Sequence, residues 1–301
     1  MNAQKIAEFL GLDLCGDGDL QVTGFAGIED CTPGAVVFAN KFREDFVFLL
    51  NACPGALAIV TGEYVGRLKC SYIVSSNPRL DYIRVLGRFF EAAAPGGGVH
   101  PTAVVDSSAV VDSSAVVGPF CFVAAGCVIG ARTVLHSSVT VDSGSVIGED
   151  CEIKSGAVIG QSGFGFERDS MGNPVHFPHF GKVVIGNRVY VGANTAIDRG
   201  TLGDTVIEDD VKIDNLVHIA HNCHIGSGAF VIAGTALGGG TRVGKNAWLA
   251  PNVSVKEKTV IGDGATVGLG SVVIRDVEAG SVVAGNPAKK LEKTVKHDKQ
   301  L

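Results

Sequence analysis

The sequence has few aromatic side chains, few charges and no long hydrophobic run. Aromatic residues make up 7% and charged residues 19% of its 301 residues, and the formal net charge is −6. This negative charge argues against a general nucleic-acid-binding surface, so we expect no nucleic-acid partner. No apolar run approaches the roughly 18–20 residues of a membrane span, and no basic start precedes an apolar stretch. We therefore expect no transmembrane segment and a cytoplasmic location.

The eight cysteines lack the spacing of a metal or redox motif. No two of them form a C-x-x-C pair. This argues against a metal centre and against a catalytic disulfide, so we expect neither a metal nor a bound cofactor. Thiols without such a pattern are typical of a reducing compartment.

An aliphatic residue recurs at every sixth position through most of the chain. The first run is Val99, Val105, Val111, Val117, Val123, Ile129, Leu135, Val141, Ile147, Ile153 and Ile159, followed by Ile185, Val191 and Ile197. After a slip of four residues the second run is Ile207, Ile213, Ile219, Ile225, Val231, Leu237, Val243, Leu249, Val255, Ile261, Val267 and Val273. A period of six fits neither a helix nor an isolated strand. It predicts a β-solenoid, in which successive coils stack equivalent residues into one buried column.

The residue four positions after each aliphatic is nearly always small. Cys121, Cys127, Cys151 and Cys223 occupy this position, so we expect them to be buried thiols. The flat aliphatic faces of a regular solenoid also favour packing of one chain against another, which predicts a homo-oligomer.

Residues 1–97 have mixed periods and are predicted to form a small α/β domain. Helices are expected at 5–10, 43–51 and 80–91, and strands at 34–38, 56–60 and 72–74. The segment 95–98 predicts a flexible joint. The solenoid is expected over 98–276 and a short C-terminal tail over 277–301. One insertion, at 161–182, interrupts the repeats with several aromatic residues, and a long excursion of this kind is usually functional.

Three histidines fall within one short segment of the solenoid, residues 213–225. His218, His221 and His224 lie between inward aliphatic residues and can reach solvent or a partner chain. An imidazole near neutral pH suits a general base for an amine or hydroxyl that attacks a thioester. A carboxylate such as Asp214 could fix its tautomer. A solvated edge or a metal site would also explain three histidines, but their clustering in a histidine-poor chain favours catalysis.

Several strings of the sequence resemble one known family. They are 159–166 (IGQSGFGF), 192–200 (GANTAIDRG), 203–205 (GDT), 212–215 (KIDN) and 219–222 (IAHN), with 16–19 (GDGD), 38–44 (FANKFRE) and 77–78 (NP) in the N-terminal part. Together they are similar to the UDP-3-O-acylglucosamine N-acyltransferase family of lipid A biosynthesis, within the hexapeptide-repeat acyltransferase superfamily. The similarity covers about residues 3–250 in order.

This resemblance implies a fold and a reaction. The fold would be mainly β: a left-handed parallel β-helix behind a small uridine-binding α/β domain, assembled as a homotrimer with active sites between subunits. The reaction would move a (3-hydroxy)acyl group from an acyl carrier protein thioester to the 2-amino group of a UDP-3-O-acylglucosamine-type sugar.

The resemblance also implies roles for individual residues. The general base falls on His221, with Asp214 as its carboxylate partner. The aromatic–Asn–aromatic motif that binds uracil falls on Phe38, Asn40 and Phe42, although it is one residue shorter here and has Phe where Tyr is usual. The other predicted substrate-binding residues are aromatic and polar side chains around these motifs: Phe164, Phe166, Asn215, His218, Asn222 and His224.

Two departures from the family concern the acyl donor. A second functional His is common about 37 residues after the first, and the aligned residue here is Lys258. The family also often ends in a helical extension that helps to hold acyl carrier protein. In this chain the segment 284–289 resembles a closing motif of the acetyl-CoA-dependent sugar acetyltransferases of the superfamily. We predict that Lys258 and Lys289 bind the phosphates of a phosphopantetheine arm, carried by acyl carrier protein or by CoA. Solvated surface lysines are the alternative.

Three interpretations therefore remain. The first is the acyl carrier protein-dependent N-acyltransferase, and the second is a CoA-dependent acyltransferase that acts on another UDP-amino sugar. The third is a solenoid scaffold without catalysis. The scaffold would need the solenoid faces but not the polar cluster around His221 and Asp214, so the sequence argues against it.

Overall fold

The computed structural model describes residues 1–90 and 97–291 and divides the chain into two compact units, 1–94 and 95–301. Each unit is described by itself. The division lies close to the predicted boundary after residue 97. Pro95 and Gly96 of the predicted joint lie outside the described residues.

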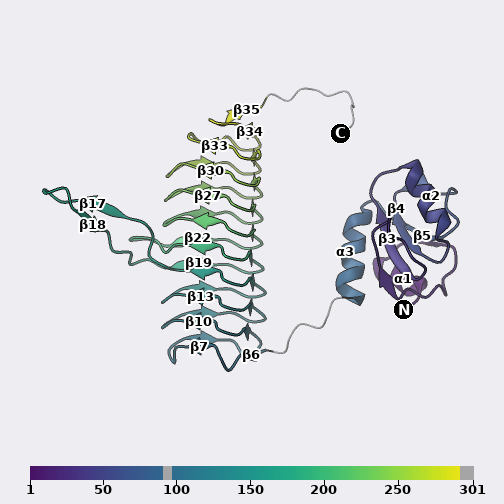
Figure 1. Cartoon of the computed structure of the whole chain (residues 1–301), viewed down its shortest axis with the longest axis horizontal. Coiled ribbons are helices and arrows are strands. Elements are labelled where there is room, and N and C mark those ends of the chain that lie inside the picture. The colour runs from purple at the N-terminus through teal and green to yellow at the C-terminus, as the bar shows by residue number, and fades with distance from the viewer. Residues whose placement is uncertain (91–96, 292–301) are drawn as a thin grey trace. The chain divides into compact units, whose positions relative to one another are not determined.

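The N-terminal unit is a five-stranded sheet with helices on both faces (Figure 1). The helices are α1 (Ala3–Leu10), α2 (Glu44–Ala52) and α3 (Pro78–Phe89), with a 3-10 turn at Gly62–Tyr64. The strands are β1 (Leu14–Cys15), β2 (Gly24–Phe25), β3 (Ala35–Ala39), β4 (Leu57–Val60) and β5 (Ser71–Val74), in the order β1-β5-β4-β3-β2. Strand β1 is antiparallel to β5, and the other neighbours are parallel. All six elements expected from the sequence are present within a few residues of their predicted bounds.

Alternation along β3 separates two apolar cores in this unit. Val36 packs into a cluster with residues of α1 and α3, whereas Val37 packs into a second cluster with Leu50 of α2. Successive side chains of a strand point to opposite faces, which places a helical layer on each side of the sheet. The three helices of the described residues are 12 residues long at most, which is too short to cross a bilayer.

The second unit is a parallel β-solenoid whose coils stack into three sheets (Figure 1). Sheet I contains β6 (Gly98–Val99), β9 (Val116–Val117), β12 (Val134–Leu135), β15 (Glu152–Ile153), β20 (Tyr190–Val191), β23 (Lys212–Ile213), β26 (Phe230–Val231), β29 (Trp248–Leu249), β32 (Thr266–Val267), β34 (Val282–Ala284) and β35 (Lys289–Lys290). Sheet II contains β7 (Val104–Val105), β10 (Phe122–Val123), β13 (Thr140–Val141), β16 (Val158–Ile159), β21 (Ala196–Ile197), β24 (His218–Ile219), β27 (Ala236–Leu237), β30 (Ser254–Val255) and β33 (Val272–Val273). Sheet III contains β8 (Val110–Val111), β11 (Val128–Ile129), β14 (Val146–Ile147), β19 (Val183–Ile185), β22 (Thr205–Ile207), β25 (His224–Ile225), β28 (Arg242–Val243) and β31 (Val260–Ile261). The predicted left-handed parallel β-helix is the observed fold.

In most strands of the solenoid the second residue carries the buried column, and in the three-residue strands β19 and β22 the third residue does. Ile129, Leu135 and Ile147 are at most 1% exposed, as the six-residue period predicts. Val99 differs because it lies on the first strand of the stack and has no preceding coil to cover it, so it remains 47% exposed. The four cysteines at the small position are buried, and burial raises the pKa of Cys223 to about 12. They are inert packing groups in a close-packed interior.

The solenoid continues beyond the predicted end at residue 276. Strand β34 pairs in parallel with β32, and β35 then returns antiparallel along β34. The prediction of a tail from residue 277 is therefore wrong up to Lys290, because Val283 occupies the inward position of one more coil. Residues 292–301 of that predicted tail lie outside the described residues.

The predicted insertion leaves the stack between β16 of sheet II and β19 of sheet III. It contains an antiparallel hairpin, β17 (Phe166–Arg168) and β18 (Pro174–His176), which projects from the solenoid (Figure 1). The segments on either side of this hairpin expose apolar side chains: the exposed fraction is 89% for Phe164 and 76% for Phe180.

Candidate functional site

Most of the polar groups that could do chemistry gather at the corner between sheets II and III. This corner, here the II–III corner, is formed by the residues that join β16 to β19, β21 to β22, β24 to β25, β27 to β28 and β30 to β31. The insertion starts there, and its first residue, Gln161, accepts a hydrogen bond from the Arg199 amide at 2.9 Å. The Arg199 guanidinium in turn donates to the Gly160 and Ser143 carbonyl groups, each at 2.6 Å. These contacts hold the base of the insertion against the corner.

His221 lies at this corner with one ring nitrogen already engaged. Its Nδ1 lies 3.0 Å from Oδ1 of Asn222. That oxygen also accepts from the amide and the hydroxyl of Thr201, while the Asn222 Nδ2 donates to the Gly203 carbonyl at 3.1 Å. Because the network fixes Oδ1 as an acceptor, Nδ1 of His221 must carry a proton in the neutral ring. Nε2 is left with the lone pair that a general base needs.

The carboxylate beside His221 is Asp198, a residue that sequence analysis missed. Asp198 lies one coil before His221 at the same corner, and its Oδ2 is 3.9 Å from Nε2 of His218. Burial raises the pKa of Asp198, and the charges of His218 and His221 act in the opposite direction. His218 is exposed at the edge of this group, so the structure brings it to the corner as the cluster predicted.

The predicted partner Asp214 belongs to a different corner, between sheets I and II. Its carboxylate accepts hydrogen bonds from the backbone amides of Asn215 and Ala233. The pairing of Asp214 with His221 is therefore not made within the chain, because the two residues follow different strands of one coil. The six residues between them span one side of the triangle.

His179 of the insertion packs against His221. The ring centroids are 5.3 Å apart and the rings are nearly perpendicular. His179 is 7% exposed, and neither of its ring nitrogens makes a hydrogen bond with the described residues. Burial lowers the pKa of His179, an effect partly offset by the nearby Phe177 carbonyl, which does not meet hydrogen-bond geometry with either ring nitrogen. The ring is neutral near pH 7 and is a buried polar group without a partner, which is unusual in a folded protein.

Gly239 makes room for the His221 ring on the next coil. A Cβ atom built on Gly239 would lie 2.7 Å from both Cε1 and Nε2 of His221. Real Cβ contacts are not so short, so any side chain here would displace the imidazole. Nothing in the sequence distinguishes this glycine among the 41 that the chain contains.

We expect Gly239→Ala to lower turnover about tenfold to a hundredfold without unfolding the protein. The φ angle at Gly239 is not positive, so alanine fits the backbone, but its methyl group must push His221 aside. Displacements near 1 Å at a reacting group can cost about a hundredfold in rate. Steady-state kinetics and a thermal melt measure the two effects. Gly62→Ala is the matched control because a Cβ there meets nothing within 4 Å; equal kinetics in both variants would contradict the prediction.

Several other predicted site residues are placed elsewhere. His224 is on sheet III and pairs with Glu208 at 2.8 Å, and the Asn215 side chain accepts from the Ala193 amide at the I–II corner. Phe164 and Phe166 are on the insertion, with ring centroids 5.0 Å apart and both rings exposed. Of the predicted polar set, the II–III corner thus collects His221 and Asn222, with His218 beside it on β24.

The predicted uracil-binding residues lie in the N-terminal unit. Phe38 packs on Tyr82 with centroids 4.8 Å apart, and Phe42 packs on Tyr64 at 5.2 Å. Phe38 and Phe42 belong to different apolar clusters, and among the described residues each ring pairs with a tyrosine rather than with the other. Asn40 is exposed, and its Oδ1 accepts from the Arg79 amide at 2.8 Å. Their role in binding uracil stays a prediction.

The two predicted donor-binding lysines are both exposed but lie on different parts of the solenoid. Lys258 is at the II–III corner, where its amide donates to the Gly239 carbonyl at 2.9 Å. Lys289 is on β35 of sheet I. The next residue, Lys290, is paired with Glu278. Only Lys258 is close to the coils that carry His221.

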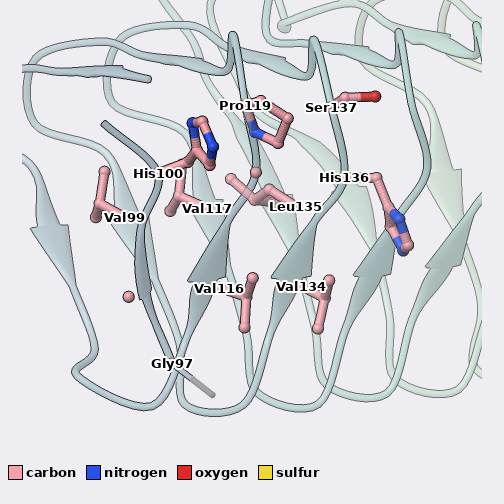
Figure 2. Close-up of a pocket in the computed structure, with 12 residues that line it drawn as sticks. Gly97, Val99, His100, Val116, Val117, Pro119, Val134, Leu135, His136 and Ser137 are labelled. Atoms are coloured by element: carbon pink, nitrogen blue, oxygen red, sulfur yellow. The ribbon is translucent and has the colours of Figure 1, made fainter. Parts of the chain in front are cut away.

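A hollow of about 610 Å³ lies on sheet I, away from the II–III corner. Figure 2 shows its lining, with Val116 and Val134 side by side on neighbouring strands and His100 and His136 nearby. None of the residues assigned to the site from the sequence lines it. His136 is paired with Glu152 at 3.0 Å.

A three-sided parallel solenoid with a polar corner beneath an insertion defines a hexapeptide-repeat β-helix protein. The model of the bacterial transferase hexapeptide family (six repeats) matches residues 126–161 and 204–239. The chain therefore carries the hexapeptide repeats of this family, and the relatives described next have the name that its motifs indicated.

Two curated relatives are named UDP-3-O-acylglucosamine N-acyltransferase. That of Coxiella burnetii is 33% identical over 223 residues, which cover 67% of this chain and 64% of the relative. The relative from Paracidovorax citrulli is 39% identical over 211 residues, which cover 68% of this chain and 62% of the relative. The chain thus spans somewhat less than two thirds of the length of these relatives. Among solved structures, the UDP-N-acetylglucosamine acyltransferase of Francisella novicida is 31% identical with a TM-score of 0.59, over 64% of this chain and 68% of that chain.

Proposed function

We propose that the protein transfers an acyl group from a thioester to the amino group of a UDP-linked, 3-O-acylated glucosamine, with His221 as the general base. The observation that carries this proposal is the state of the His221 ring. Asn222 holds Nδ1 as a donor, so Nε2 has a free lone pair beside the largely buried carboxylate of Asp198. The names of the relatives, each an acyltransferase that acts on a UDP-linked glucosamine derivative, support the substrate class.

The reaction needs little more than a positioned base. As the amine nitrogen bonds to the carbonyl carbon of the thioester, its proton passes to Nε2 of His221. The positive charge that then forms on the imidazole is stabilised by the carboxylate of Asp198. When the carbonyl group re-forms and the C–S bond breaks, the same proton passes to the departing sulfur. A neutral ring is thereby regenerated for the next cycle.

The donor is proposed to carry a phosphopantetheine arm, on acyl carrier protein or on CoA. Lys258 supports this because it lies at the II–III corner two coils beyond Asn222, about 10 Å along the stack at the usual spacing of strands. An exposed ammonium at that distance suits a phosphate of the arm. Lys289 lies on β35 of sheet I, away from Lys258, and its contact with the arm stays a prediction. The exposed rings of Phe164 and Phe166 are proposed to contact the acyl chain.

The remaining parts of the proposal concern assembly and recognition of the nucleotide. Phe38, Asn40 and Phe42 are proposed to contact the uracil, and the II–III corner is proposed to be completed by a neighbouring chain in a homotrimer in the cytoplasm. The exposed apolar side chains of the insertion, such as Phe180 and Met171, support such a neighbour because they leave a large apolar surface uncovered in one chain.

A donor screen tests the proposed function. Purified protein is offered acyl carrier protein thioesters and CoA thioesters with a UDP-3-O-acylglucosamine, and amide formation is followed by mass spectrometry. We expect N-acylated product with one donor class and none without protein. An absence of product with every donor, from folded protein, would refute the proposal.

A further inference from the structure

Asp198 is a poorly satisfied charged group at the II–III corner. Its side chain is 13% exposed, and no residue in the described part of the chain donates a hydrogen bond to its carboxylate. The group nearest to it that can carry a positive charge is His218, at 3.9 Å. Withdrawing a carboxylate from water is costly unless donors replace the water. The carboxylate therefore needs a ligand that brings hydrogen-bond donors and a positive charge.

His179 is a second acceptor aimed at the same place. A Cβ built on Gly163 would lie 3.1 Å from Nε2 of His179, 3.2 Å from Oδ2 of Asp198 and 3.3 Å from Cβ of His221. The three residues thus converge on a glycine that keeps the space between them open. Since burial lowers the pKa of His179, its ring is neutral and one of its unpartnered nitrogens has a lone pair.

We propose that Asp198 binds the amino group of the acceptor in its ammonium form and makes this corner select an amine over a hydroxyl. An ammonium donates three hydrogen bonds, which matches Asp198 and His179, and it also cancels the carboxylate charge. A hydroxyl at the same position donates one hydrogen bond and brings no charge. The inference rests on the proposed function and names the chemical group that the site chooses.

Protons balance in the resulting sequence of steps. The bound ammonium passes one proton to the carboxylate of Asp198, which releases it to water past His218, whose side chain is 51% exposed. A neutral amine with its lone pair then lies beside the ionised carboxylate. The amine attacks the thioester carbon and gives a second proton to His221, which passes it to the sulfur as the C–S bond breaks. An amide, a thiol and one proton are the products.

Calorimetry with two ligands that differ only at the sugar C2 position tests the inference. UDP-glucosamine has an amine there and UDP-glucose a hydroxyl. At pH 6.5, where such an amine is protonated, the wild-type protein should bind UDP-glucosamine about tenfold or more tightly than UDP-glucose. Asp198→Asn keeps the shape of the side chain but removes its charge. In this variant the ratio of the affinity for UDP-glucosamine to that for UDP-glucose should fall to about three or less, with the affinity for UDP-glucose unchanged.

Asp150→Asn is the matched control, because Asp150 is paired with Arg132 on another corner. It should keep the wild-type ratio. If Asp198→Asn fails to fold, Gly163→Ala serves instead, since its methyl group intrudes beside Oδ2 of Asp198 and should also reduce the ratio.

A wild-type protein without preference for UDP-glucosamine overturns the inference, as does a preference that survives both Asp198→Asn and Gly163→Ala. Either result leaves acyl transfer itself to be judged by the donor screen. A clear amine preference without any acyl transfer would instead refute the proposed function and leave the amine site standing.

Discussion

Replacing His221 with alanine is expected to lower the turnover of acyl transfer about 10²–10⁴-fold while the solenoid stays folded. The side chain lies at a corner, outside the buried column that Ile219 and Cys223 form on either side of it. Its removal therefore creates no cavity in the core. What is lost is the one imidazole at the II–III corner whose Nε2 is held free by a hydrogen bond at Nδ1. Initial rates with saturating substrates and a thermal melt measure activity and fold separately.

His136→Ala is the matched control for this experiment. His136 is also a half-exposed solenoid histidine that pairs with a neighbour, Glu152, but it follows β12 of sheet I rather than a strand of sheet II. We expect its kinetics to equal those of the wild type. Turnover of His221→Ala within threefold of the wild type would remove His221 from the mechanism. A matching loss in His136→Ala would point to a general effect on the solenoid.

The solenoid could be predicted from the sequence because its coils repeat the same contacts. Each inward aliphatic, such as Ile129 or Leu135, lies beside its equivalents on the neighbouring coils, so a period in the sequence is also a spatial column. The end of the column was harder to predict. Val283 continues it after an irregular step, and the sequence around it resembles a closing motif rather than a repeat.

The site was predicted in part, for a physical reason. His221 and Asn222 lie in one motif, so the sequence pointed to both. Asp198 contacts the same corner from the preceding coil, and the step of 22 positions from Ala196 to its paired residue His218 includes the slip that breaks the six-residue count. A coil count that allowed for this slip would have placed Asp198 beside His221 and Asp214 one corner away.

His179 could not be predicted in the same way. It belongs to an insertion that has no period, and its contact with His221 depends on how the 161–182 segment folds back on the solenoid. The sequence indicated only that the insertion was functional. The lack of a partner for its ring nitrogens is visible only in three dimensions.

Replacing Asn222 with glycine is expected to lower turnover about tenfold to a thousandfold by releasing the His221 tautomer. Asn222 has a φ of 61°, in the left-handed region, and glycine adopts this conformation without strain. The substitution removes the oxygen that accepts from Nδ1 of His221 and from Thr201. Without it the proton can move to Nε2, where the ring can no longer act as a base. Loss of the orienting partner of a catalytic histidine can cost up to about 10⁴-fold in other enzymes.

Asn222→Asp separates the tautomer from the fold. Aspartate tolerates the same φ and still offers oxygens to Nδ1 of His221, so we expect it to keep turnover within about tenfold of the wild type. Both variants should melt within a few degrees of each other. Both retain the backbone N–H of residue 222, which donates to the Thr205 hydroxyl at 2.8 Å. A glycine variant as active as the aspartate variant would show that Asn222 supports the corner but does not set the protonation of His221. The free lone pair on Nε2 would then need another explanation.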